Sequence, residues 1–142
     1  MSPTKPVSEC RKLKVILDSN ALFASLQFRI DIFTELKTVL NRSFEPVLLF
    51  QVKKELERIA AEKSPKKRRE AAYALKMAEK CKLVKLDEEF AGSPDEAIVK
   101  AASEWRCPVF TNDKELRKRL RDISVPVIYV RQKSRLEIDG RV

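Results

Sequence analysis

The chain has 142 residues, a length that fits one domain and allows a substantial core. Its 30 Lys and Arg residues against 21 Asp and Glu give a formal charge of +9, which favours a polyanionic partner such as nucleic acid. A heavily charged, solvated surface would explain the same excess without any partner. The sequence has no His and only two Gly, which excludes Ser/His/Asp triads, histidine-bearing zinc sites and glycine-rich phosphate loops.

The cysteines and the hydropathy pattern indicate where the protein works. Cys10, Cys81 and Cys107 are odd in number and far apart, which is typical of reduced thiols and not of a disulfide framework. The first 14 residues lack the apolar segment of a signal peptide, and no apolar run approaches membrane-spanning length. We therefore expect a soluble, cytoplasmic protein without a membrane partner, folded as a single domain with its core at about residues 13–135 and short tails.

The N-terminal half predicts two buried strands, each followed by helix. The apolar runs at residues 13–17 and 47–50 are typical of buried parallel strands. Between them, residues 20–40 show a helical apolar period with one interruption, which indicates two helices. A further helix begins at Gln51. Its apolar stripe contains a carboxylate, Glu55, which needs a partner because burying an isolated charge is costly.

The C-terminal half continues this alternation. Ser64 and Pro65 begin a helix whose first turn carries four cations, at residues 66–69, and a short strand is expected at 83–86. The remaining expected elements are a helix that begins with a capping box of Ser93, Pro94 and Glu96, a strand at 108–110, a helix with a cap-like pair of Asn112 and Glu115, and a strand at 125–130.

This order of elements predicts the fold. Strands that alternate with helices, without hairpin signals, indicate an α/β fold with an open, mainly parallel five-stranded sheet and helices on both faces. In such sheets, ligands bind beyond the carboxyl ends of the strands. Side chains that directly follow the strands are therefore the first candidates for a functional site.

Four acids are predicted to meet at that edge of the sheet. Asp18 and Asp113 directly follow strands, while Glu55 and Asp95 lie in the first turns of the helices after two other strands. Helix starts favour Asp and Glu as caps, which would explain Asp95 or Asp113 alone. All four together repel one another unless a multivalent cation or shared protons compensate them. Oxygen ligands without His or Cys indicate Mg²⁺ or Mn²⁺.

At these motifs the sequence resembles the PIN-domain ribonucleases. The resemblance covers roughly residues 13–135, and its narrower likeness is to archaeal single-domain relatives of the small-subunit processome nucleases that process rRNA. The residues that carry it are Asp18-Ser19-Asn20, the helix with Glu55, Asp95 followed by Ile98 and Ala102, and Thr111-Asn112-Asp113.

The resemblance implies a PIN-like fold and roles for individual residues. Asp18, Asp95 and Asp113 would ligate a principal metal ion, and Glu55 would join a second ion or orient the water. Asn20 and Thr111 would hold the carboxylates in place. The reaction would be metal-assisted phosphodiester hydrolysis that leaves a 5′-phosphate and a 3′-hydroxyl.

Basic residues near the C-terminus are the candidates for holding RNA. For any one of them a solvated position is the simpler explanation, because Lys and Arg are mostly exposed in all proteins. As a set they follow the last acid and the last predicted strand. They are Lys114, Arg117, Lys118, Arg121, Arg131 and Lys133.

We therefore expect a Mg²⁺- or Mn²⁺-dependent endoribonuclease with rRNA or pre-rRNA as its substrate. One alternative is a VapC-like toxin ribonuclease that an antitoxin protein inhibits, and another is a non-catalytic RNA-binding module in ribosome assembly. The sequence also leaves a homodimer open. Phosphatases of the haloacid dehalogenase type are disfavoured because they need a second Asp where this chain has Asn20.

Overall fold

The computed structural model describes residues 12–86, 92–132 and 135–142, and its strands form one six-stranded sheet. The strand order is β3-β2-β1-β4-β5-β6, with β5 and β6 antiparallel and every other neighbouring pair parallel. The strands are β1 (Leu13–Leu17), β2 (Phe44–Leu49), β3 (Lys82–Val84), β4 (Val109–Phe110), β5 (Val127–Arg131) and β6 (Arg135–Asp139).

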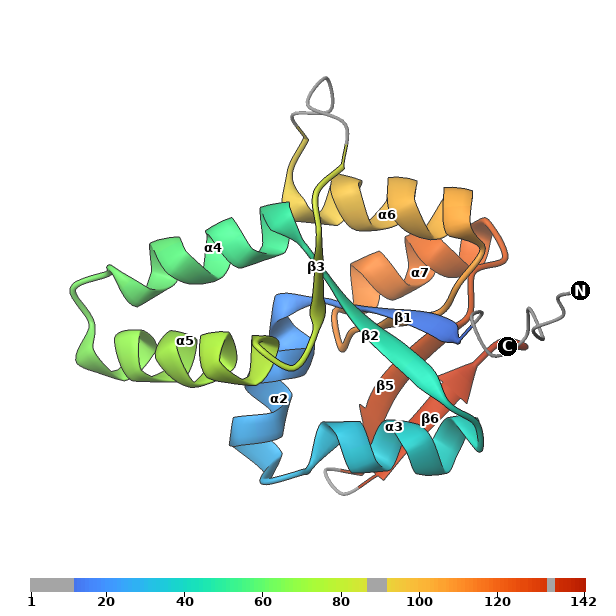
Figure 1. Cartoon of the computed structure of the whole chain (residues 1–142), viewed down its shortest axis with the longest axis horizontal. Helices are drawn as coiled ribbons and strands as arrows, with labels where there is room; N and C mark the ends of the chain where they lie inside the picture. Colours follow the sequence, from blue (N-terminus) through green and yellow to red (C-terminus); the bar gives the residue numbers. More distant parts are fainter. Residues whose placement is uncertain (1–11, 87–91, 133–134) are drawn as a thin grey trace, which may run out of the picture.

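Helices cover both faces of this sheet, which confirms the predicted α/β fold. In Figure 1, α6 and α7 lie on one side of the strands and α2 and α3 on the other, while α4 and α5 run alongside each other and project from one end. The helices are α2 (Ser19–Phe28), α3 (Ile32–Leu40), α4 (Phe50–Ala60), α5 (Pro65–Ala78), α6 (Pro94–Trp105) and α7 (Lys114–Asp122).

The strand order reverses beside β1. From β1 the chain moves outward to β2 and β3, and it then returns to the other side of β1 with β4 and continues to β5. A reversal of this kind leaves a crevice at the carboxyl ends of the two strands that flank it, and in open α/β sheets ligands bind there. The residues that follow β1 and β4 are therefore the candidates for a ligand-binding site.

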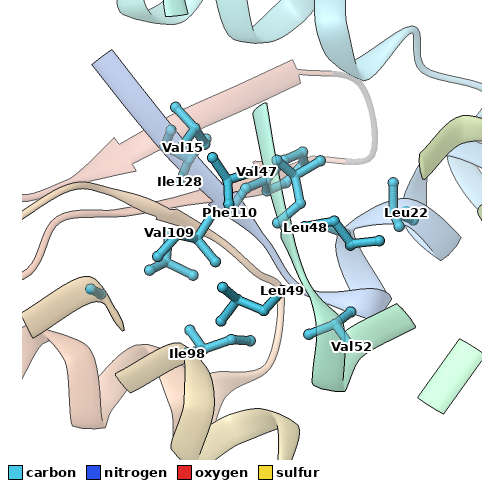
Figure 2. Packing of buried hydrophobic residues seen from close by; sticks show 14 of the residues in the cluster. Val15, Leu22, Val47, Leu48, Leu49, Val52, Ile98, Val109, Phe110 and Ile128 are labelled. Atoms are coloured by element: carbon cyan, nitrogen blue, oxygen red, sulfur yellow. The ribbon is translucent and has the colours of Figure 1, made fainter. Parts of the chain in front are cut away.

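The core explains why the central strands β1 and β4 are mainly apolar. Val15 on β1 and Val109 and Phe110 on β4 are fully buried, because helices pack on both sides of the sheet. Figure 2 shows Val15 next to Ile128 of β5, across the cluster from Ile98 of α6 and Val52 of α4, which close the core from the helical layers. Such packing fixes the ends of β1 and β4 relative to each other, and with them the residues that follow.

The structure corrects the predicted strand count. Residues 135–139, expected to be part of a tail, form β6, which pairs antiparallel with β5 through Tyr129 and Glu137. The absence of a hairpin was therefore a wrong prediction. The sequence has no Gly or Asn at the connection. Instead Gln132 adopts the left-handed conformation at φ 56, which such turn residues usually supply.

Two further features of the described residues are the state of the cysteine thiols and the length of the helices. Cys81 and Cys107 are free, and burial raises the pKa of these thiols to about 12 and about 11. Cys10 lies outside the described residues. In the part of the chain that the structure describes, no helix is both long and apolar enough to cross a bilayer.

Candidate active site

Asp18 lies where the strand order reverses, and its carboxylate is held from both sides. One oxygen, Oδ1, accepts a hydrogen bond from the Ser19 N–H at 2.7 Å, and the other, Oδ2, accepts from the Thr111 hydroxyl at 2.7 Å. The Asp18 N–H donates to the Phe110 carbonyl at 3.0 Å, which links β1 to β4. The residue is only 4% exposed. Asp18 therefore has a fixed orientation at the carboxyl end of β1.

Thr111 and Asn20 connect Asp18 to the turn after β4. The fully buried Thr111 hydroxyl accepts from the Asp113 N–H at 3.1 Å and lies 3.2 Å from the side-chain oxygen of Asn20. That Asn20 oxygen also accepts from the Asn112 N–H at 2.9 Å. Thr111 thus contacts the Asp18 carboxylate directly, whereas Asn20 is connected to the acids only through Thr111 and the backbone of Asn112.

Asp113 is the N-cap of α7. Its Oδ1 accepts from the backbone N–H groups of Glu115 at 2.9 Å and Leu116 at 3.2 Å. The prediction that Asn112 serves as this cap was wrong, because the Asn112 side chain instead accepts from the Val130 N–H of β5 at 2.8 Å. Sequence reasoning missed this role of Asn112, and its place in a Thr-Asn-Asp turn was the available signal.

Glu55 has the partner that its place in an apolar stripe requires. The residue is half-buried in the second turn of α4, one turn further along than predicted, and the Ser19 hydroxyl donates to its Oε1 at 3.2 Å. Ser19 was not predicted as a site residue. Because Ser19 directly follows Asp18, it ties two of the candidate acids together from the first turn of α2.

Asp95 completes the set from α6. As predicted, Ser93 caps this helix by accepting from the Glu96 N–H at 3.3 Å, which places Asp95 in the first turn. Burial raises the pKa of Asp95, and the negative charge of Asp113 raises it further, against a lowering effect of Arg119. Arg119 itself pairs with Glu96 at 3.0 Å.

The electrostatics show that the four acids share one region. Burial raises the pKa of Asp18 to about 6, despite hydrogen bonds that lower it, and the charges of Asp95 and Glu55 raise it as well. Asp113 acts in the same way on Asp95. A carboxylate in this position is unfavourable when ionised, because both burial and like charges oppose its charge.

The donor set fits a hard divalent cation in its chemistry. It consists of carboxylate oxygens alone, and the buried charge of Asp18 faces other negative charges that a cation would neutralise. Within residues 12–86, 92–132 and 135–142, no three or more His, Cys, Asp or Glu side chains are placed so that they could hold a metal ion together. Binding an ion would therefore require side-chain movements of Glu55, Asp95 or Asp113 toward the fixed Asp18.

The predicted RNA-binding residues separate into different places. Lys114 and Lys118 are exposed on α7, and Arg117 and Arg131 line a pocket beside the Thr111-Asn112-Asp113 turn. Arg121 lies at the opposite end of β5, where it donates to the Val125 carbonyl at 3.3 Å. The remaining candidate, Lys133, lies outside the described residues.

Comparison with known proteins places this arrangement in a family. A family model described as a PIN like domain matches residues 15–133. The chain belongs to this PIN-like domain family. The resemblance stated from the sequence motifs and the predicted fold class are thereby confirmed.

Two curated relatives of this PIN-like domain are archaeal. Ribonuclease VapC4 of Methanocaldococcus jannaschii is 38% identical over 130 residues, which cover 91% of this chain and 98% of the relative. Ribonuclease VapC9 of Archaeoglobus fulgidus is 27% identical over 124 residues, which cover 87% of each chain.

Solved structures show the same fold. The PIN domain endonuclease Utp24 superposes with a TM-score of 0.75 at 28% identity, over 91% of this chain and 92% of that chain. The structure of VapBC2 from Rickettsia felis bound to a DNA fragment from their promoter gives a TM-score of 0.58 at 15% identity, over 75% and 92%. At that identity the second likeness concerns the fold alone.

Proposed function

We propose that this PIN-like domain is a metal-dependent endoribonuclease that hydrolyses RNA phosphodiester bonds. The observation that carries the proposal is Asp18, a 4% exposed carboxylate that faces Asp95 and Glu55 where the strand order reverses. Uncompensated charge of this kind is costly to bury, so a ligand that neutralises it gives the arrangement a purpose. The names of the two curated relatives, both ribonucleases, support the same activity.

The four acidic side chains would have different roles in holding metal ions and orienting water. Asp18, Asp95 and Asp113 would hold a Mg²⁺ or Mn²⁺ ion, and Glu55 would hold a second ion or orient the attacking water. When bound, the cation supplies activation of water and neutralisation of the charge that develops on the phosphodiester. Asp18 would give the least movable oxygen, because Thr111 and the Ser19 N–H fix its two oxygens at 2.7 Å each.

For the biological role, a VapC-like ribonuclease is better supported than rRNA processing. Ribonuclease VapC4 shares 38% of its residues with this chain over 98% of its own length, and the second curated relative carries a VapC name too. We propose on this basis that an antitoxin protein is a partner of the chain. In this role, induced wild-type protein would arrest the growth of a host cell, and co-expressed antitoxin would restore it.

An rRNA-processing role is the second candidate, and the Utp24 likeness favours it. That structure matches at a TM-score of 0.75 over 92% of its own chain, in line with the narrower resemblance seen in the sequence motifs. Sequencing the 5′ ends of cellular RNA after a short induction separates the two roles. Cuts confined to rRNA precursors would support processing, and cuts in tRNA or mRNA with growth arrest would support the VapC-like role.

The activity itself is tested with labelled RNA and purified protein. We expect cleavage in Mg²⁺ or Mn²⁺, no cleavage in EDTA, and no cleavage by an Asp18→Asn variant that still binds RNA. An Asp31→Asn variant is the matched control, because Asp31 also caps a helix but is exposed, on α3. Cleavage that persists in EDTA would exclude the metal mechanism, and RNA binding without any cleavage by the wild type would favour the non-catalytic module.

A further inference from the structure

A basic pocket lies directly beside the candidate active site. It has a volume of about 400 Å³ at the carboxyl end of β5, and its polar lining includes Asn112, Lys114, Arg117, Tyr129 and Arg131. Asn112 and Lys114 flank Asp113 in the sequence, so the pocket and the acids share one turn. A polymer bound across the acids would pass over this pocket.

Two of the residues that line the pocket, Arg117 and Tyr129, stack on each other. The Arg117 guanidinium lies 3.8 Å from the centroid of the Tyr129 ring, and the Arg117 side chain remains 32% exposed. Flat, partly exposed surfaces of this kind accept nucleobases, because aromatic rings and guanidinium planes both stack on base faces. Any base offers such a face, so the pair would bind bases without strong sequence preference.

The strand β6 holds the pocket walls in place. Asp139 accepts from Arg117 Nε at 3.0 Å, and Glu137 accepts from Arg131 Nη1 at 3.0 Å. The Tyr129 hydroxyl donates to the same Glu137 oxygen at 3.3 Å. Side chains fixed before binding lose less conformational entropy when a ligand arrives, so these contacts favour binding.

The pocket also has cationic groups for a phosphate. Lys114 is exposed at the first position of α7, and Arg131 is a half-exposed guanidinium at the end of β5. A hydrogen bond of 2.8 Å from the Val130 N–H to Asn112 joins this strand end to the turn that carries Asp113. A phosphate beside Lys114 would therefore belong to a nucleotide close to the acids.

We propose that this pocket is a binding site for an unpaired nucleotide next to the phosphodiester that the acids cut. The proposal rests on the proposed nuclease function and adds to it the place where the nucleotide beside the cleavage site is held. The base stacks on the pair of Arg117 and Tyr129, and Lys114 contacts a phosphate. A base in a duplex is stacked on its neighbours and cannot enter, so paired RNA binds weakly.

The test measures binding in EDTA, where cleavage is not required. Fluorescence anisotropy with a labelled single-stranded pentaadenylate compares the wild type with Tyr129→Ala, Tyr129→Phe and Lys114→Ala. We expect Tyr129→Ala to weaken binding roughly tenfold and Tyr129→Phe, which keeps the ring, to stay near the wild type. Lys114→Ala should lower the slope of log affinity against log salt by about 0.7.

Matched controls lie on α5, away from the pocket. Tyr73→Ala and Lys76→Ala remove an exposed tyrosine and an exposed lysine there, and both should bind the pentaadenylate like the wild type. A blunt-ended, GC-rich RNA duplex that stays paired under the assay conditions should bind at least several-fold more weakly than an unpaired strand of the same length. Wild-type affinity in both Tyr129→Ala and Lys114→Ala, or equal binding of the duplex, would overturn the proposal. Lys114→Ala changes an exposed side chain, so its result stands even if Tyr129→Ala fails to fold.

The two proposals can fail separately. If the pocket variants lose pentaadenylate binding but the wild type cuts no RNA with metal, the binding site stands and the nuclease function fails. If the wild type cuts RNA and the pocket variants bind and cut like it, the nuclease stands and the pocket fails.

Discussion

Two regions of this protein contain acidic side chains, and they differ in whether basic side chains neutralise the negative charge. At the ends of β1 and β4, Asp18 faces Asp95 and Glu55, and its pKa is raised to about 6. Between α7 and β6, Asp139 accepts from Arg117 at 3.0 Å and from Arg121 at 3.3 Å. The chain thus neutralises its acids in one region and leaves like charges together in the other.

This difference indicates where a ligand would bind. An acid that meets two arginines needs nothing further, and the pair between α7 and β6 serves to attach the last strand. A buried acid that meets other acids is costly for the folded chain, and such costs are typical of functional sites. Substitutions in one region or the other should therefore have different effects, the largest of them on RNA cleavage.

Asp95→Asn, like Asp18→Asn, should cause a large loss of cleavage. Removing a charged group that would ligate the ion should lower the RNA cleavage rate roughly a thousandfold, equivalent to a few kcal/mol of transition-state stabilisation. Glu96→Gln is the control from the next position, because Glu96 is exposed and pairs with Arg119. Single-turnover cleavage of a labelled RNA measures both. Equal losses of cleavage rate in the two variants would mean that Asp95 contributes only a nonspecific negative charge and does not ligate an ion.

Asp18→Asn should stabilise the folded chain above pH 6. The pKa of Asp18 is about 6 in the folded chain and near 3.8 when unfolded, so between these values the folded chain binds more protons and stability falls as pH rises. The variant should gain up to about 3 kcal/mol at pH 7.5, and the gain should vanish near pH 4. Its amide can donate to Thr111 while the Thr111 hydroxyl turns to Asn20, 3.2 Å away.

Urea unfolding in EDTA from pH 4 to pH 8 measures this effect. Asp31→Asn should behave in the opposite way, because hydrogen bonds from Thr34 lower the pKa of Asp31. That contribution is present above the unfolded pKa and is lost as pH falls through the folded one. A loss of stability in Asp18→Asn at pH 7.5 would show that the burial of this carboxylate is fully compensated.

Ser19→Ala should have an intermediate effect on cleavage. The hydroxyl of Ser19 holds Glu55 at 3.2 Å, and residues that orient ligands in this way typically contribute about 10- to 100-fold. Ser19→Thr keeps the hydroxyl and should retain most activity. Steady-state kinetics should show the loss in kcat with KM little changed, whereas a purely structural defect would appear as a lower melting temperature in Ser19→Ala.

Asp139→Asn should have the smallest effect, on stability. Its pairs with Arg117 and Arg121 involve side chains that are 32–36% exposed, so solvent screens them and the loss should be about 1 kcal/mol. Glu62→Gln, which removes an exposed pair with Arg58, should cost less than about 0.5 kcal/mol. Thermal unfolding compares the two, and equal costs would show that the α7–β6 contacts add nothing beyond a surface pair.

The parts of the fold that depend on local pattern could be predicted. The apolar run of β1 and the Ser93 cap of α6 are such parts, because burial on both faces and capping leave a direct mark in the sequence. Strand β6 could not be predicted, since its turn uses Gln132 in a left-handed conformation instead of a residue that favours it. The pairing with β5 is decided by tertiary contacts.

The same difference between local sequence pattern and tertiary contacts applies to the candidate site. Asp18 and Glu55 could be selected as candidates because one ends an apolar strand and the other interrupts an apolar stripe. The partners of these acids were harder to find. Ser19 and Asn112 act through contacts to elements distant in the sequence, so the residues around them give only a weak signal, which for Asn112 is the Thr-Asn-Asp turn. Arg121 carries the charge expected of an RNA contact but lies at the other end of β5.

The central claim, that the four acids bind a divalent cation, is tested most directly by titrating Mn²⁺ into the protein without RNA. Isothermal titration calorimetry at pH 7.5 should show binding to the wild type and to Asp31→Asn. It should show affinity lowered at least tenfold in Asp18→Asn and in Asp95→Asn. Equal binding of Mn²⁺ by all four proteins, or by none of them, would contradict the account.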